Sequence, residues 1–199
     1  MEILRAFIAI DLDDKTQKAL SRIQDELKET KADIRFIKPE NIHLTLKFLG
    51  DITKDKAEAI TQVLEETSRV LKPFSISLTD IDAFPEIEHP EIIWVGANQG
   101  RSEVKGFVLR LEEELEKIGF AKEKREFESH ITLGRLRSNL NQNSLIKTLK
   151  TFQMDSPIIQ NVHSLTLFKS TLTPRGPIYE PLEIFPLTRI LQSKIRPKG

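Results

Sequence analysis

The chain has 199 residues, of which 39% are hydrophobic, and this is enough to bury one large domain or two small lobes that share a core. Its 30 basic and 30 acidic side chains cancel, which excludes a general nucleic-acid coat protein with a strong basic excess. The absence of cysteine excludes disulfides, a cysteine nucleophile and zinc sites of the cysteine type.

No stretch of the chain reaches the 18 or so consecutive apolar residues that a membrane-spanning helix needs. The N-terminal sequence "MEILRAFIAIDLDD" is too short and turns acidic too soon for a secretory signal. We therefore expect a soluble protein that works in the cytoplasm.

Strands are predicted where Ile, Phe and Thr alternate with polar residues, and helices where Leu and Ile recur every three or four positions. In the first half of the chain these patterns predict strands at 5–12, 34–38, 43–49 and 74–84, and helices at 13–30 and 54–72. In the second half they predict strands at 91–97, 130–136, 162–172 and 177–187, and helices at 101–119 and 141–152.

The order of elements in the second half repeats that of the first, which indicates an internal duplication. Phe7 precedes His43 by 36 residues, and Trp94 precedes His130 by the same 36. We expect one bilobal domain over 1–199, built from repeats at about 4–84 and 91–172 and closed by the strand at 177–187. The Pro-rich, acidic segment 85–91 is predicted to be the linker. Pseudo-symmetric repeats would set equivalent strands face to face across a cleft.

Two short motifs, "HLTL" at 43–46 and "HITL" at 130–133, occupy equivalent places in the two repeats. Because side chains alternate along a strand, each histidine shares a face with the threonine two residues on, and aliphatic residues occupy the other face. One neutral and one charged imidazole can accept and donate protons at a phosphorus centre near neutral pH. The threonine hydroxyls can donate hydrogen bonds to the phosphate oxygens.

A single motif of this kind is more often a packed histidine in a strand, but its recurrence at matching positions favours a catalytic pair. A metal site is the rival interpretation, and two histidines without cysteine are too few for a closed zinc site. His89, in the Pro-rich segment, is interpreted as a solvated loop residue, and His163, at a strand start, as structural.

These paired motifs, with "RAFIAIDL" at the start and "STLTPRGPIYEPLEIFPL" near the end, resemble the 2H phosphoesterase superfamily. Within it, the chain is similar to the RNA 2′,3′-cyclic phosphodiesterases, formerly described as 2′-5′ RNA ligases, from about residue 4 to 187. The resemblance implies an α+β fold in which two antiparallel sheets line a central cleft and helices pack outside. It also implies hydrolysis of an RNA 2′,3′-cyclic phosphate to a 2′-phosphate, without metal or cofactor.

Carried onto this chain, the resemblance implies that His43 protonates the departing 3′ oxygen and His130 activates water. Thr45 and Thr132 would hold the phosphate oxygens. Because the two repeats are nearly symmetric, the sequence alone does not assign the acid and the base. Ser129 stands where many relatives have a proline before the second histidine.

Three further residues are predicted to bind substrate: Arg135, Lys47 and Tyr179. Ideal alternation turns Arg135 away from the face of His130, unless a bulge at Gly134 turns it inward. Lys47 has the same parity as His43, so it is expected to face the cleft. Less specific candidates for the rim that contacts RNA are Arg5, Arg137, Lys169 and Arg175.

Two other functions remain open from the sequence. The same catalytic residues could run the reverse reaction, as a 2′-5′ RNA ligase. Alternatively, the chain could be an RNA-binding module without catalysis, although binding alone does not need two facing imidazoles. The expected partners are RNA ends or small nucleotides that carry a 2′,3′-cyclic phosphate, and the protein is expected to be a monomer.

Overall fold

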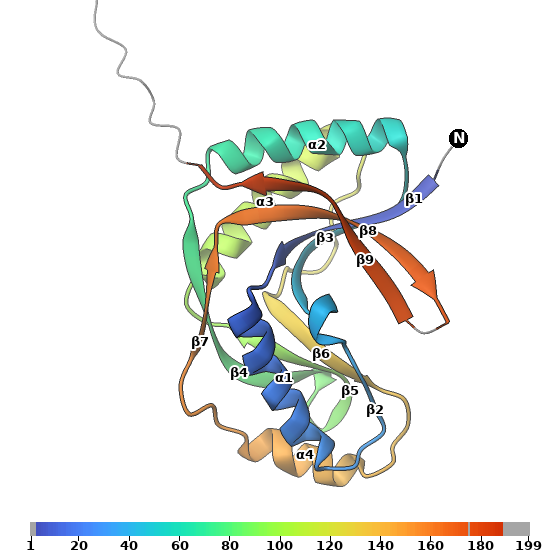
Figure 1. Cartoon of the computed structure of the whole chain (residues 1–199), viewed down its shortest axis with the longest axis vertical. Coiled ribbons are helices and arrows are strands. Elements are labelled where there is room, and N and C mark those ends of the chain that lie inside the picture. Colours follow the sequence, from blue (N-terminus) through green and yellow to red (C-terminus); the bar gives the residue numbers. More distant parts are fainter. Residues whose placement is uncertain (1–2, 175, 189–199) are drawn as a thin grey trace, which may run out of the picture.

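Two antiparallel sheets with helices packed outside them form the fold of the computed structural model, which describes residues 3–174 and 176–188 (Figure 1). This confirms the α+β class. The strands are β1 Ile3–Asp11, β2 Ile34–Phe36, β3 His43–Thr53, β4 Phe74–Glu86, β5 His89–Ala97, β6 His130–Leu136, β7 Ile158–Val162, β8 Ser164–Thr173 and β9 Gly176–Pro186. The helices are α1 Asp14–Lys28, the 3₁₀ helix η1 Pro39–Asn41, α2 Lys54–Arg69, α3 Arg101–Lys117 and α4 Gln142–Thr151.

The two repeats exchange strands. The first sheet has the order β3-β1-β8-β9, and the second has the order β2-β6-β5-β4-β7. Strand β4 from the first half pairs with β5 in the second sheet, while β8 from the second half pairs with β1 in the first. Each sheet therefore contains strands from both halves of the chain, and neither sheet corresponds to one repeat.

The segment 85–91 differs from its predicted role as a linker. Pro85 and Glu86 end β4, His89 and Pro90 begin β5, and the turn between them occupies only two residues. The imidazole of His89 bonds the carboxylate of Glu86 across this turn, at 2.8 Å. The proline and acidic residues therefore mark a hairpin within the second sheet.

Side chains cap the starts of α1 and α2. The side chain of Asp13 accepts a hydrogen bond from the amide of Thr16 at the start of α1, and Thr53 does the same for Lys56 at the start of α2. Helix α1 then buries Leu20, Ile23 and Leu27 and packs against β6 and β7, while α2 packs against the first sheet and α3 (Figure 1). Within the described ranges, no helix is both long and apolar enough to cross a membrane.

The strands that carry the two motifs, β3 and β6, pack against each other where the two sheets meet. Both show the same burial pattern, with Leu44 and Leu46, or Ile131 and Leu133, buried in the main core. The histidine and threonine of each motif lie on the opposite face. The exchange of strands thus sets the two histidine faces on the walls of one cleft.

Candidate active site

The cleft between the sheets has a volume of about 220 Å³ and brings both motifs together. Four of its lining residues are the predicted catalytic set, His43, Thr45, His130 and Thr132, and Arg135 and Tyr179 join them. The remaining lining residues come from β2, β3, β9 and the segment around η1: Arg35, Ile37, Asn41, Phe48 and Pro177.

Both imidazoles are held in the same way. The Nδ1 atom of His43 lies 2.8 Å from the carbonyl oxygen of Asn41, and Nδ1 of His130 lies 2.8 Å from the carbonyl oxygen of Glu128. A carbonyl oxygen can only accept a hydrogen bond, so Nδ1 carries a proton in both rings. Each neutral ring therefore keeps its lone pair on Nε2, and each charged ring carries its second proton there.

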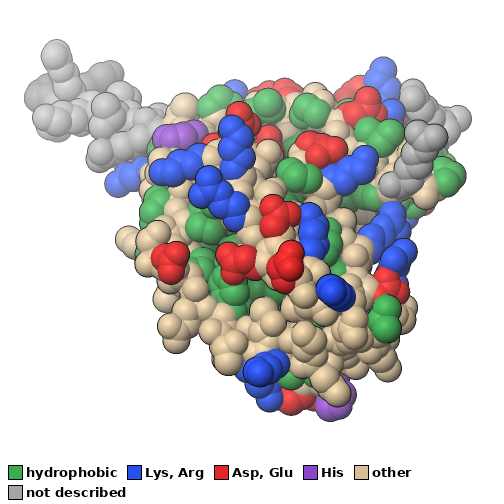
Figure 2. All heavy atoms as spheres, turned by 60° about the horizontal axis from the view of Figure 1, so that its bottom comes forward, with side chains coloured by type: hydrophobic (Ala, Val, Ile, Leu, Met, Phe, Trp, Pro, Cys, Tyr) green, Lys and Arg blue, Asp and Glu red, His purple; other side chains and the backbone are tan. Residues whose placement is uncertain are grey.

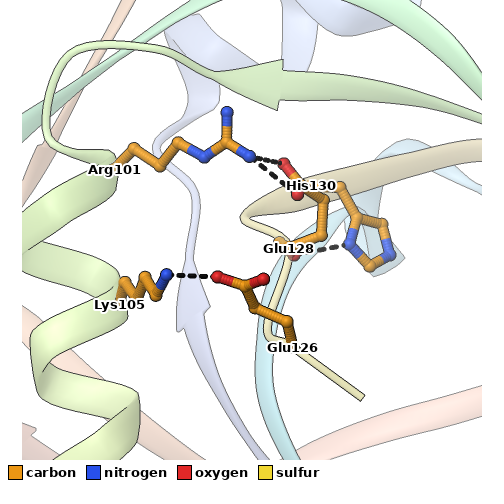
Figure 3. A network of polar contacts seen from close by, with 5 residues as sticks. All are labelled: Arg101, Lys105, Glu126, Glu128 and His130. Carbon is orange, nitrogen blue, oxygen red and sulfur yellow. Dashed lines mark hydrogen bonds and ion pairs between the residues drawn. The ribbon is translucent and has the colours of Figure 1, made fainter.

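The carbonyl groups that orient the histidines belong to residues whose side chains are also anchored. The Glu128 carboxylate accepts a hydrogen bond from Arg101 at the start of α3, at 2.7 Å, and Glu126 pairs with Lys105 one turn further on (Figure 3). At the equivalent place before His43, the Asn41 amide donates to the carbonyl of Pro177 on β9, at 3.0 Å. Elements outside the motifs thus fix the approach to each histidine.

Each histidine packs against a stacked aromatic pair. His43 lies against Phe7, with ring centroids 4.8 Å apart, and Phe7 stacks on Phe168 at 5.2 Å. His130 meets Phe84 edge to face at 5.0 Å, and Phe84 in turn stacks on Trp94. These aromatic supports restrict how far the rings can tilt away from the cleft.

The surroundings of His43 favour its neutral form. Burial lowers the pKa of His43 from its ordinary 6.5 to about 4, and the bond to the Asn41 carbonyl offsets only part of this effect. Tyr179 meets the His43 ring edge to face at 5.2 Å. Burial also raises the pKa of Tyr179, which stays neutral although the charge of Arg135 acts in the opposite direction.

A β-bulge brings Arg135 to the cleft. On β6, Thr132 pairs with Trp94 and Gly134 with Ile93, so Leu133 is an extra residue without a partner on β5. Such a residue reverses the alternation beyond it. Arg135 therefore lies on the face of His130 and Thr132 and lines the cleft, as the bulge considered from the sequence requires.

An equivalent bulge in β3 shows that the prediction of Lys47 as a cleft residue was wrong. On β3, Thr45 pairs with Ala9 and Lys47 with Ile8, which leaves Leu46 as the extra residue. Lys47 consequently points away from the cleft and is only 4% exposed. Its ammonium group forms an ion pair with Glu112 at 2.7 Å and donates to the carbonyl of Ala121 at 2.8 Å. Strand alternation counted without the bulge therefore placed Lys47 on the wrong face of β3.

The sequence reasoning missed five of the residues that line the cleft: Arg35, Ile37, Asn41, Phe48 and Pro177. Arg35 and Phe48 are the two at positions comparable with Arg135. Phe48 occupies the place in β3 that Arg135 occupies in β6, 87 positions later, and its side chain is 67% exposed. Arg35 lies on β2 directly opposite Arg135. The matching position in the repeat could have indicated Phe48, whereas Arg35 depends on a pairing between distant strands.

The other candidate cations lie outside this cleft. Arg137 bonds the carboxylate of Asp33 at 2.9 Å, and Lys169 lies 3.8 Å from Glu180. Arg5 is on β1 opposite Asp51, and it does not line the cleft. Arg175 falls outside the described residues.

A second hollow, with a volume of about 470 Å³, is lined in part by Phe84 and Trp94. Its charged lining consists of Asp80, Asp82 and Glu128 against Arg101. Three carboxylates and one guanidinium disfavour a phosphate there. Neither hollow contains a metal-binding cluster, since no group of three His, Asp or Glu in 3–174 and 176–188 could hold a metal ion.

Comparisons with known proteins agree with this duplicated architecture. The model of the LigT like phosphoesterase family matches the chain twice in succession, over residues 10–94 and 95–179. The RNA 2′,3′-cyclic phosphodiesterase of Methanothermobacter thermautotrophicus is 36% identical over 92% of this chain and 99% of its own length. The protein of the same name from Archaeoglobus fulgidus is 31% identical over 92% of this chain and 99% of its own length.

Solved structures support the same fold. A crystal structure from Thermus thermophilus superposes with a TM-score of 0.77 at 23% identity and covers 94% of this chain and 98% of its own. The apo form of E. coli LigT gives a TM-score of 0.75 at 24% identity, and the match covers 94% of this chain and 99% of LigT. The fold and the paired histidine motifs define a phosphoesterase of the 2H type. The chain belongs to the LigT-like phosphoesterase family, which confirms the resemblance predicted from its motifs.

The buried ion pair of Lys47 leads to a prediction about stability. Lys47→Met removes the cation and leaves the buried Glu112 carboxylate with only the hydrogen bond from the amide of Glu123, so we expect the free energy of unfolding to fall by about 3 kcal/mol. Urea denaturation measures the change. Adding Glu112→Gln, which removes the unpaired charge, should recover most of the loss. A Lys47→Met protein as stable as the wild type would show that the pair does not hold β3 to α3.

The lowered pKa of His43 predicts how stability depends on pH. The unfolded chain binds a proton at this residue near pH 6.5, whereas the folded chain binds it only near pH 4. The contribution of His43 to the free energy of unfolding is therefore complete above pH 6.5 and is lost as the pH falls toward 4. The melting temperature of the wild type should fall more steeply over this range than that of His43→Gln. Parallel curves for the two proteins would contradict a depressed pKa.

Proposed function

We propose that this chain is an RNA 2′,3′-cyclic phosphodiesterase that opens a terminal cyclic phosphate to a 2′-phosphate and a free 3′ hydroxyl. The observation that carries the proposal is the pair of imidazoles in one cleft, each with Nδ1 tied to a carbonyl and Nε2 left for chemistry. The relatives from Methanothermobacter thermautotrophicus and Archaeoglobus fulgidus, both more than 30% identical, carry the name of this activity.

In the proposed reaction, Nε2 of neutral His130 accepts a proton from water as the water oxygen attacks phosphorus. The bond between phosphorus and the 3′ oxygen breaks, and Nε2 of charged His43 donates its proton to that oxygen. One proton enters the protein at His130 and one leaves at His43, so the pair is restored when the proton returns to His43 through solvent. No step requires a metal ion.

The phosphate itself is proposed to bind between the two walls. Within the described part of the chain, the hydroxyls of Thr45 and Thr132 make no protein hydrogen bond, so both are free to donate to phosphate oxygens. Arg135, on the same face as Thr132, adds a positive charge that stabilises the developing negative charge.

The low pKa of His43 places a condition on its role as the acid. In the empty cleft this ring is neutral at pH 7, since its pKa is about 4. The negative charge of a bound phosphodiester favours the protonated ring and raises its pKa. We therefore propose that His43 gains its proton together with the substrate, and that His130 is the base.

The proposal also covers the domain organisation, the oligomeric state and the cellular location of the protein. The chain is one bilobal domain of two repeats, about 4–84 and 91–172, completed by 177–187, and the twofold match to the family model supports this division. It acts as a monomer. It works in the cytoplasm.

Product analysis tests the activity. An oligonucleotide that ends in a 2′,3′-cyclic phosphate should be converted to the 2′-phosphate, and not the 3′-phosphate, in the presence of EDTA. Chromatography against both synthetic products identifies the isomer. Loss of turnover in chelator, with recovery on adding zinc or manganese, would contradict the two-histidine mechanism. Joining of ends to a 2′–5′ linkage as the main product would favour the ligase.

Substitution of the histidines tests their roles. We expect His43→Ala and His130→Ala each to lower kcat about 100-fold or more, and the double variant to lose little further, because the two residues act as a unit. A substrate with sulfur in place of the 3′ oxygen separates the roles, because a thiolate departs without a proton. It should restore turnover to His43→Ala and not to His130→Ala.

The control for these variants is His89→Ala, which removes a histidine at the β4–β5 turn, away from the cleft. It should keep wild-type turnover, and thermal unfolding should show that all variants are folded. Rescue of His130→Ala by the sulfur substrate, in place of His43→Ala, would exchange the acid and the base. A fully active His130→Ala protein would reject the paired mechanism.

A further inference from the structure

Two arginines stand directly opposite each other at one rim of the cleft. Arg35 on β2 pairs in register with Arg135 on β6, with no irregularity between these strands. Residues opposite each other in an antiparallel pair have side chains on the same face, and like charges in this arrangement destabilise a sheet. Both arginines line the cleft.

No carboxylate of the described residues pairs with either of these arginines. Nearby arginines are paired: Arg137, two positions beyond Arg135, bonds Asp33, and Arg101 bonds Glu128. The sheet therefore keeps an unrelieved repulsion at this rim. An anion bound between the two guanidinium groups would relieve it.

Arg35 lies one strand farther from the catalytic motif than Arg135. Neighbouring strands are about 4.8 Å apart, and β2 is the edge of its sheet. The guanidinium of Arg35 reaches toward the hairpin of β8 and β9, because a Cβ atom added to Gly176 would lie 3.2 Å from its Nη2. The charge of Arg35 is thus at the mouth of the cleft, beyond the place where Thr132 and Arg135 hold a phosphate.

Among the described residues that line the cleft, those of the opposite wall carry no comparable charge. Phe48 occupies the position in the first repeat that Arg135 occupies in the second, and Tyr179 lies beside His43. One wall is aromatic and the other carries two cations. On the face shown in Figure 2, Lys and Arg side chains are interspersed with Asp and Glu, so that face has no uniformly cationic track for RNA.

We propose that Arg35 binds the phosphate that links the terminal nucleotide to the preceding one, so that the enzyme selects RNA ends over cyclic mononucleotides. This inference rests on the proposed cyclic phosphodiesterase function. In the proposed complex, Arg135 contacts the reacting phosphate, and Arg35 contacts the next phosphate along the RNA. The RNA backbone leaves the cleft over β2, along the cationic wall.

The test compares adenosine 2′,3′-cyclic phosphate with the dinucleotide ApA that ends in the same cyclic phosphate. The quantity measured is the ratio of kcat/KM for the dinucleotide to that for the mononucleotide. Arg35→Ala should lower this ratio about tenfold, the usual scale for one charge-assisted hydrogen bond. The matched control Arg137→Ala, whose arginine is held by Asp33, should leave the ratio at the wild-type value.

A second substrate change identifies the phosphate that Arg35 contacts. Replacing the internucleotide phosphate with an uncharged methylphosphonate should cost the wild type about tenfold and cost Arg35→Ala nearly nothing. An unchanged ratio in Arg35→Ala, or equal losses on both substrates, would overturn the proposal. Absence of turnover of either substrate by the wild type would reject the cyclic phosphodiesterase function itself. Equilibrium binding of ApA ending in a 2′-phosphate, with and without the methylphosphonate, would then decide the role of Arg35.

Discussion

An extra residue directly after the threonine of each H-x-T motif determines which side chains reach the cleft. Leu46 in β3 and Leu133 in β6 lack partners on the neighbouring strands β1 and β5, so alternation restarts after each. Specific contacts hold both irregularities. The carbonyl of Leu133 accepts hydrogen bonds from the amide of Ile37 and from the side chain of Gln24, each at 2.9 Å. Beside Leu46, the buried ammonium of Lys47 is held by Glu112 and the Ala121 carbonyl. The active-site surface thus depends on contacts made in the core.

Duplication produces two histidines with the same bonding but different surroundings. The identical Nδ1 contacts let either ring act as acid or base, since both present Nε2 to the cleft. Only His43 is enclosed by Phe7, Phe168 and Tyr179, and this burial lowers its pKa to about 4. An asymmetric hydrolysis requires that the two rings differ. The aromatic enclosure of His43 makes its surroundings differ from those of His130, and its proposed role as the acid then depends on the phosphate charge that favours its protonated form.

The charge balance of the chain conceals a local asymmetry. A net charge of zero excludes a general affinity for nucleic acid, and acidic and basic side chains are interspersed on the face in Figure 2. Within the cleft, however, Arg35 and Arg135 share one wall, and Phe48 and Tyr179 line the other. The two walls therefore differ in charge where the substrate is proposed to bind, while the H-x-T residues are equivalent.

Most elements of the fold, and the meeting of the two H-x-T motifs in one cleft, could be predicted from the sequence, because hydrophobic periodicity and strand alternation are local. Spacing within H-x-T alone put each histidine and threonine on one face, and the duplication implied a shared cleft. Strand β7 and the exchange of β4 and β8 could not be predicted, because they depend on which distant strands pair. The hairpin at 85–91 is local, but its prolines and acidic residues are also typical of a linker. The same reason explains Lys47, which a bulge turns into the core, and Arg35, which meets Arg135 only through the pairing of β2 with β6. Periodicity is a property of neighbours in the chain, whereas register is decided by partners that only the folded sheet brings together.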